Sequence, residues 1–338
     1  MRPQDRPPKD SGQVRLARQD SPYGVLEFLY WDHAWNNHHY PSRASIDRSI
    51  ELMKKCGVGM VRMDFLWQDI EPSAGTCVFD KYDYIVGALT RSNIAVLGVL
   101  SYHADWASPD KKWNVPNQDH SFFLDYCRKV CGRYKGRVKF WEIWNEPDSK
   151  IYWEPQDGLR EYAGLLQDAY RALKEIDPGC TVLNGGLSEG IASVNTLYER
   201  GARDYFDVMN IHAFESPVKK DAIESVVSFV KAVAAAMDRN GDTKKRIWVT
   251  EIGCPGVKAG TRVADSWLGE NPSELQQAGW VTQIFHEVLA LDRVDKVFWA
   301  FFRDTDNHWK NGVDYFGLVR NDFSLKPAYR AYREAAVL

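Results

Sequence analysis

The sequence has no stretch that approaches the ~20 consecutive apolar residues of a membrane-spanning helix, and residues 1–20 hold no apolar segment typical of a secretion signal. It also lacks long blocks of one charge, since 43 basic and 46 acidic residues leave a formal net charge of −3. A membrane or a nucleic acid is therefore a poor candidate for the main partner. The compartment stays open, because the chain can be cytoplasmic or secreted with its signal removed.

Cysteine spacing gives no sign of a metal or redox motif. The six cysteines form no CxxC pair and no spacing typical of zinc ligands. We expect free buried thiols, with one or two disulfides as the alternative. No glycine-rich phosphate fingerprint follows the first predicted strand, so a dinucleotide-binding fold has little support. We predict no cofactor and no bound metal, and the sequence does not specify an oligomeric state.

Aromatic residues, in contrast, are abundant, at 13% of the chain with 13 tryptophans. Sugar rings pack their C–H faces on aromatic planes while their hydroxyl groups bond to polar partners. Composition therefore suggests a pocket for carbohydrate without establishing one.

Strand and helix patterns alternate along the chain, which predicts an α/β fold. Eight βα units in strict alternation need parallel strands with crossover helices, and they close into a (β/α)8 TIM barrel rather than an open sheet. No linker rich in Gly, Ser or Pro follows residue 21, so we predict one catalytic domain over residues 21–338, after a disordered lead-in at 1–20. The predicted strands are 24–30, 58–65, 94–100, 138–144, 180–185, 206–212, 246–252 and 296–302. The predicted helices are 43–55, 81–91, 119–134, 158–175, 192–200, 221–239, 273–291 and 326–337.

Two of the predicted strands end in a glutamate. The stretch 140–147 ends with Asn145, Glu146 and a proline, and the stretch 246–253 ends with Glu251 before a glycine. The carboxyl ends of barrel strands form the active face of this fold, so both carboxyl groups are expected at one pocket. A protonated and an ionised carboxyl facing each other are what cleavage of a glycosidic bond requires.

These two strand ends carry a resemblance to a known group of enzymes. Trp144-Asn145-Glu146-Pro147 and Thr250-Glu251 resemble the signature of the retaining glycoside hydrolases with (β/α)8 barrels, known as clan A. Within the clan the chain is most similar to family 39, while families 5 and 42 share much of the same framework. The resemblance implies double displacement at O-glycosidic bonds of a poly- or oligosaccharide. Glu146 would be the acid/base and Glu251 the nucleophile.

Other positions match the clan pattern and receive expected roles. Asn145 is expected to bond the sugar 2-hydroxyl, and Arg62 to hold Glu251 ionised, with a structural salt bridge inside the barrel as the alternative. His103 and His212 are expected to contact sugar hydroxyls or carboxylates, with a structural role as the alternative. Trp299 is expected to be the platform beneath the scissile sugar.

Further substrate contacts are expected from the loops. Trp31, Trp106 and Trp153 are candidates for outer sugar subsites, with simple packing as the alternative. His33 lies in a histidine-rich loop that also contains Asp32, His38 and His39, and sugar contact is favoured there over a metal.

Two departures from the family pattern limit the resemblance. Family 39 xylosidases usually carry an added β-sandwich, and this chain ends after the eighth helix, so we expect a compact, endo-acting enzyme. Phe214 also stands where the clan often has a tyrosine that bonds the nucleophile, so Arg62 or His212 is expected to orient Glu251. The alternatives are a transglycosylase, a non-hydrolytic carbohydrate-binding barrel and a metal-dependent hydrolase built on the histidines.

Overall fold

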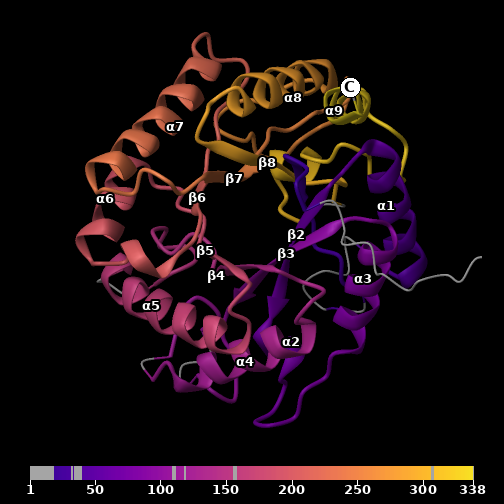
Figure 1. Ribbon diagram of the computed structural model, residues 1–338. Coiled ribbons are helices and arrows are strands. Elements are labelled where there is room, and N and C mark those ends of the chain that lie inside the picture. Colours follow the sequence, from indigo (N-terminus) through magenta and orange to yellow (C-terminus); the bar gives the residue numbers. More distant parts are fainter. Residues whose placement is uncertain are drawn as a thin grey trace, which may run out of the picture.

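Eight parallel strands form a barrel that a ring of helices surrounds (Figure 1). The computed structural model describes residues 19–31, 33, 40–108, 112–117, 119–154, 158–305 and 308–337. Residues 1–18 of the predicted lead-in lie outside these ranges, as do Asp32, His38 and His39 of the histidine-rich loop. The prediction of a (β/α)8 barrel is confirmed.

The strands are hydrogen-bonded in the order β5-β4-β3-β2-β1-β8-β7-β6. Between β5 and β6, a parallel bridge joins Leu183 to Val208. The Asn184 Nδ2 donates to the Asn210 carbonyl at 2.9 Å, and the Asn210 backbone N–H donates to Asn184 Oδ1 at 2.8 Å. These contacts close the ring. The strands are β1 (Tyr23–Leu26), β2 (Met60–Leu66), β3 (Ala95–Ser101), β4 (Phe140–Ile143), β5 (Thr181–Asn184), β6 (Met209–His212), β7 (Ile247–Ile252) and β8 (Val294–Ala300).

The helices begin and end at residues with clear sequence signals. The Ser42 side chain caps the first helix, and Gly57 ends it with φ of 87°, a backbone conformation that glycine adopts without strain. Ser273 and Gln276 form a capping box on the eighth. The helices are α1 (Arg43–Cys56), α2 (Trp67–Ile70), α3 (Asp80–Arg91), α4 (Ser121–Tyr134), α5 (Gly158–Ile176), α6 (Ile191–Glu199), α7 (Ala222–Arg239), α8 (Glu274–Leu289) and α9 (Pro327–Val337). Helix α9 lies between α8 and α1 and completes the ring (Figure 1).

The barrel interior is apolar at its floor and polar above. Gly24 has room for no side chain, because a Cβ there would lie 2.3 Å from the Phe298 ring. Side chains alternate along each strand, so the inward positions above the floor continue through Arg62 on β2 and Glu142 on β4. The floor cluster comprises Met60, Ala95, Leu97, Leu183, Val208, Trp248 and Phe298.

Strand β1 is shorter than the predicted range 24–30, because it ends at Leu26. The chain beyond it stays buried but bonds to the loop after β8 through a side chain. The Glu27 carboxylate accepts the backbone N–H groups of Phe302 at 2.8 Å and Arg303 at 2.9 Å. The six cysteines are free. None of the helices in the described ranges is long and apolar enough to cross a membrane.

Candidate active site

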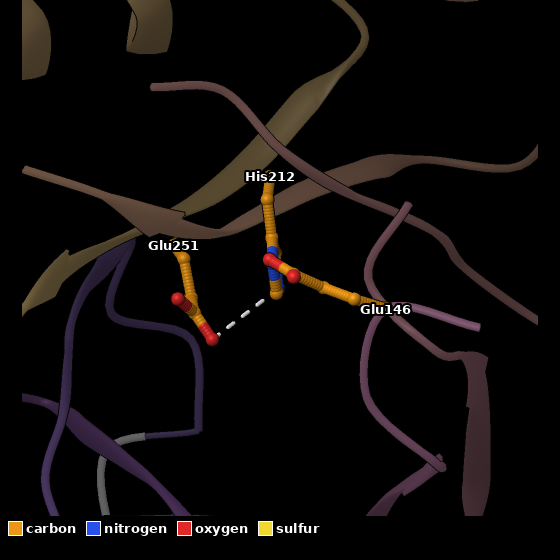
Figure 2. A group of neighbouring side chains, drawn as sticks. All are labelled: Glu146, His212 and Glu251. Carbon is orange, nitrogen blue, oxygen red and sulfur yellow. Dashed lines mark hydrogen bonds and ion pairs between the residues drawn. The ribbon is translucent and has the colours of Figure 1, made fainter. Parts of the chain in front are cut away.

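Three polar side chains converge at the carboxyl ends of β4, β6 and β7. Glu146 follows β4, His212 ends β6 and Glu251 lies in β7, and their side chains point toward one another (Figure 2). One carboxyl oxygen of each glutamate and one ring nitrogen of His212 all lie within 4.8 Å of one another. Each glutamate side chain is 13% exposed, whereas His212 is fully buried. The site is therefore a recess that a ligand can reach.

The backbone at the end of β4 adopts an uncommon conformation that aims Glu146. Trp144 and Glu146 have φ of 66° and 42°, in the left-handed region that side-chain-bearing residues avoid. Surrounding contacts hold this conformation. The Trp144 backbone N–H donates to the Leu100 carbonyl at 2.9 Å, and its indole N–H donates to the Tyr152 carbonyl at 2.8 Å. The Tyr162 hydroxyl donates to the Ile143 carbonyl at 2.9 Å.

Arg62 connects Glu142, deeper in the barrel, to Glu251. Its Nε and Nη2 donate to the two Glu142 oxygens at 2.7 and 2.8 Å, and its Nη1 donates to Glu251 Oε1 at 2.6 Å. Both expected contacts of Arg62 are therefore present, the internal salt bridge and the bond to Glu251. Arg62 Nη2 also donates to Asn145 Oδ1 at 2.7 Å. Because arginine only donates, the Asn145 oxygen must face it, which leaves the Asn145 amide N–H groups for a ligand.

A hydrogen-bond chain fixes the tautomer of His212. The Thr250 hydroxyl donates to Asn210 Oδ1 at 2.6 Å, so its oxygen is left to accept from His212 Nε2, 3.1 Å away. A neutral His212 with its proton on Nε2 has a bare Nδ1, which lies 2.7 Å from Glu146 Oε1. That short contact is a hydrogen bond only if Glu146 carries a proton. The chain therefore favours a protonated Glu146.

The pKa shifts agree with this proton assignment. Burial, and then the negative charge of Asp148, raises the pKa of Glu146 to about 8, while burial lowers the pKa of His212. Near neutral pH, Glu146 is therefore protonated and His212 neutral. Burial also raises the pKa of Glu251, but His212 and the Arg62 guanidinium oppose that shift. The bond to Arg62 makes Glu251 the better anion of the two.

Several predicted contact residues line the mouth of the barrel. His103 Nε2 lies 2.9 Å from Asp105, and His33 Nε2 lies 3.0 Å from Asp69. Trp31 is half-buried, with the Arg43 guanidinium 4.9 Å from its ring centre. Trp106 is half-buried too and donates to the Glu71 carbonyl at 2.7 Å. Sugar contact by these four residues stays a prediction.

Two tryptophans assigned to sugar binding are packed away from the site. Trp299 has no exposed surface, and its indole donates to the Phe316 carbonyl at 2.9 Å. It lies one residue after the inward-facing Phe298, so the alternation of side chains along β8 turns it toward the helices. Trp153 is 2% exposed and packs edge-to-face on Trp144. The predicted platform and subsite roles of Trp299 and Trp153 are corrected to core packing.

Hollows lie among the loops that follow β5 to β8. One of about 210 Å³ adjoins His212 and is lined by Phe214, Glu215 and Ser188, among others. A larger hollow of about 540 Å³ lies between the loops after β7 and β8, and neither Glu146 nor Glu251 lines it. Neither glutamate lines the smaller hollow either, but His212, which bonds to Glu146, does.

The same three side chains, Glu146, His212 and Glu251, form the group best able to offer ligands to a metal ion in the described part of the chain. Their surroundings disfavour that role. The Arg62 guanidinium already occupies one Glu251 oxygen at 2.6 Å and repels a cation. The geometry suits acid–base chemistry between two carboxyls better than metal binding.

Thr250 and Asn210 are contributors that the sequence did not reveal. Thr250 is adjacent to Glu251 in the motif, but nothing in its spacing indicates a bond to His212. The register of β6 against β7 shifts between Ile211 and His212, and the register of β7 against β8 shifts at Ile247/Trp248 and again between Val249 and Ile252. This irregularity lets neighbouring residues of β7 both serve the site.

Comparison with known proteins places the chain among the glycosyl hydrolases. The family model described as cellulase, glycosyl hydrolase family 5, matches residues 27–286. The chain belongs to this family. Membership confirms the predicted resemblance to the (β/α)8 glycoside hydrolases, although the sequence match is to family 5, while family 39 is found among the similar structures.

Solved structures of other glycosidases share the fold of this chain. A family 39 glycoside hydrolase from Bacteroides cellulosilyticus has a TM-score of 0.73 and 23% identity, and the match covers 96% of this chain and 65% of that one. Xylanase 10B from Thermotoga maritima has a TM-score of 0.65 and 17% identity, over 95% of this chain and 96% of that one.

Curated relatives match a smaller part of the chain. The 6-phospho-beta-glucosidase of Clostridium longisporum is 29% identical over 139 residues, which are 37% of this chain and 28% of the relative. Phospho-cellobiase of Klebsiella oxytoca is 28% identical over 145 residues, 40% of this chain and 28% of that protein. The match thus spans little more than a quarter of these relatives.

Proposed function

We propose that the chain is a retaining glycoside hydrolase that cleaves β-linked O-glycosidic bonds of a poly- or oligosaccharide. The observation that carries the proposal is the pair of glutamate oxygens within 4.8 Å, one glutamate favoured as acid and the other as anion. Retaining enzymes hold their carboxyl groups ~5–5.5 Å apart, whereas inverting enzymes need ~6.5–9.5 Å to admit a water. The close pair therefore favours double displacement.

The first step forms a covalent intermediate. Glu251 attacks the anomeric carbon, the bond from that carbon to the leaving oxygen breaks, and Glu146 gives its proton to that oxygen. In the second step the ionised Glu146 takes a proton from water. The water oxygen displaces Glu251 from the anomeric carbon, and the sugar leaves with its original configuration.

Neighbouring groups support both steps. Arg62 stabilises the anionic Glu251 before attack and after release. The amide N–H groups of Asn145, oriented by Arg62, are placed to bond the 2-hydroxyl of the sugar, a contact that strengthens in the transition state.

The proposed substrate class takes support from the names of the similar proteins. They are called 6-phospho-beta-glucosidase, phospho-cellobiase, beta-xylosidase and xylanase. Two of these names specify a β-glycoside, a phosphorylated glucoside in one and a xyloside in the other. Endo attack stays a prediction. Digestion of a long glycan tests it. A rapid fall in chain length indicates endo attack, whereas steady release of small sugars indicates exo attack. A redistribution of chain lengths without new reducing ends would indicate transglycosylation.

Substitution of each glutamate tests the assignment. Glu146→Gln should slow deglycosylation, and with it the turnover of an activated 2,4-dinitrophenyl glycoside, by about 10²–10⁴-fold. Azide should restore part of this turnover, because it attacks the glycosyl-enzyme without a general base. Glu251→Gln should abolish turnover, and azide should not restore its hydrolysis. Glu51→Gln, an exposed change on α1, is the matched control and should act like wild type. Undiminished hydrolysis by either active-site variant would end the assignment.

A further inference from the structure

Asp64 is a buried carboxyl that the proposed reaction does not use. It is 6% exposed and lies on β2, two residues after Arg62. Side chains two apart on a strand share a face, and Arg62 points inward to Glu142 and Glu251. Asp64 therefore faces the barrel interior as well, one layer nearer the mouth.

Asp64 has no hydrogen-bond partner among the described residues, although the charge of Arg62 opposes the rise in its pKa that burial causes. Across the described ranges, no group donates a hydrogen bond to it or forms an ion pair with it. Glu142, one layer below, receives two bonds from Arg62 and one from the Gly186 backbone N–H. A carboxyl that is 6% exposed and has no hydrogen-bond partner in the described ranges is poorly satisfied by the protein itself, so a ligand can supply the missing bonds.

The charges around Asp64 place it on the same recess as the glutamate pair. Burial, followed by the charges of Glu146, Glu251 and Asp64, raises the pKa of the Tyr152 hydroxyl. Burial and Asp64 likewise raise the pKa of Tyr102. The two tyrosine rings stack 6.4 Å apart. All three carboxyls thus surround one aromatic-walled space.

The position of β2 indicates which part of a substrate Asp64 would meet. In the ring order, β2 and β6 are four strands apart and so lie across the barrel from each other. The 210 Å³ hollow adjoins β6 beside His212, on the side of the proton donor Glu146. Asp64 lies beside Arg62, which holds the nucleophile Glu251. The leaving group belongs to the β6 side, and the sugar that Glu251 attacks belongs to the β2 side.

We propose that Asp64 determines specificity for the attacked sugar, by accepting hydrogen bonds from hydroxyl groups other than the 2-hydroxyl. This inference rests on the proposed function. In its ionised form Asp64 accepts hydrogen bonds and does not donate them, so it selects neutral sugars with hydroxyls at that place. The same charge disfavours sugars that carry a carboxylate or a phosphate there.

The test uses 2,4-dinitrophenyl β-D-glycosides of glucose, xylose, galactose and glucuronic acid. The burst of dinitrophenol gives the rate constants of glycosylation and deglycosylation, and its amplitude counts the active sites. The attacked sugar is present in both steps, whereas the leaving group is present only in the first. Asp64→Asn should therefore lower both rate constants about 10- to 100-fold on the preferred neutral sugar. The variant should also show a smaller ratio between its rate constants on the neutral sugar and those on the glucuronide.

Asp168→Asn, which removes one charge from the outside of α5, is the matched control and should leave both rate constants unchanged. Asp64→Asn should unfold at the same or a higher temperature, since it removes an unpaired buried charge. Unchanged rate constants per active site would overturn the inference, with or without a lower unfolding temperature. A lower rate constant for glycosylation alone would also overturn it. So would a variant that discriminates against the glucuronide as strongly as the wild type does. Hydrolysis by Glu251→Gln would instead overturn the proposed function itself.

Discussion

A hydrogen-bond chain runs from Asn210 through Thr250 and His212 to Glu146. Its direction favours a proton on Glu146. Each link has one direction, because Thr250 donates to Asn210 and can then only accept from His212. The chain ends 2.7 Å from Glu146. A threonine hydroxyl inside the barrel thus favours, together with burial, the protonated form of Glu146.

The pH profile of Thr250→Val tests this control. In the wild type, kcat/KM should fall as pH rises through about 8, where Glu146 loses its proton. The variant leaves His212 Nε2 with only the Glu251 oxygen 3.6 Å away, so its proton can move to Nδ1 and stabilise ionised Glu146. The basic limb should then shift down by about half to one pH unit. Thr250→Ser keeps the hydroxyl and serves as the control, and a limb that stays in place in the valine variant would refute the role.

Sequence motifs identified the two glutamates and the arginine that bonds Glu251, but not Thr250, whose hydroxyl orients the proton of His212. Glu146 and Glu251 end strands and stand in a recognisable pattern, so their meeting at one rim follows from the fold. Thr250 and Asp64 carry no such signal. Thr250 acts through a local shift in strand register, and the significance of Asp64 lies in a missing partner, which only a structure can show.

A buried ion pair next to α9 anchors the loop that follows β8. Lys326 Nζ donates to Asp304 Oδ1 at 2.7 Å and to the carbonyls of Tyr315 at 2.8 Å and Gly256 at 3.1 Å. It therefore joins the loops that follow β7 and β8. These loops border the larger hollow.

Lys326→Met should destabilise the protein strongly, because it leaves Asp304 buried without its cation. Breaking such a pair costs about 3–5 kcal/mol of unfolding free energy. Lys326→Met combined with Asp304→Leu should regain a large part of that loss, since no uncompensated charge remains. Urea unfolding measures both. A double variant no more stable than the single one would show that the lysine acts through the carbonyls rather than through the ion pair.

The elements themselves were largely predictable. Residues 43–55 and 158–175 were predicted helices, and α1 and α5 match them within one residue at each end. The predicted strand 206–212 begins three residues early, because a 3-10 turn at Arg203–Tyr205 precedes β6. Apolar periodicity and capping residues are local signals, whereas the onset of a short strand depends on its neighbours in the sheet.

The whole molecule buries acidic groups both in its closed barrel and in the loops above it. Burial raises the pKa of Glu27 and Asp64 to about 7, of Glu146 to about 8 and of Asp304 to about 6. All four groups hold a proton more tightly in the folded state than in the unfolded chain, where carboxyls titrate near ~4. The folded state therefore binds more protons from about pH 4 up to these pKa values.

Stability should accordingly decrease as pH rises from about 5 to about 8. Each group contributes a slope of up to ~1.4 kcal/mol per pH unit while the folded state alone keeps its proton. Urea midpoints across this range measure the effect, and Glu146→Gln should flatten it most between about pH 7 and 8. Midpoints that rise over the same range would contradict the assigned shifts.

The central claim is that Glu251 forms a bond to the sugar while Glu146 handles the proton. The most direct measurement is mass spectrometry of peptides after reaction with a 2,4-dinitrophenyl 2-deoxy-2-fluoro-β-D-glycoside, whose fluorine slows release of the covalent intermediate. The account predicts one fluorosugar per chain, attached to Glu251, with activity lost in proportion to labelling. A label on another residue, or inactivation without any covalent sugar, would contradict it.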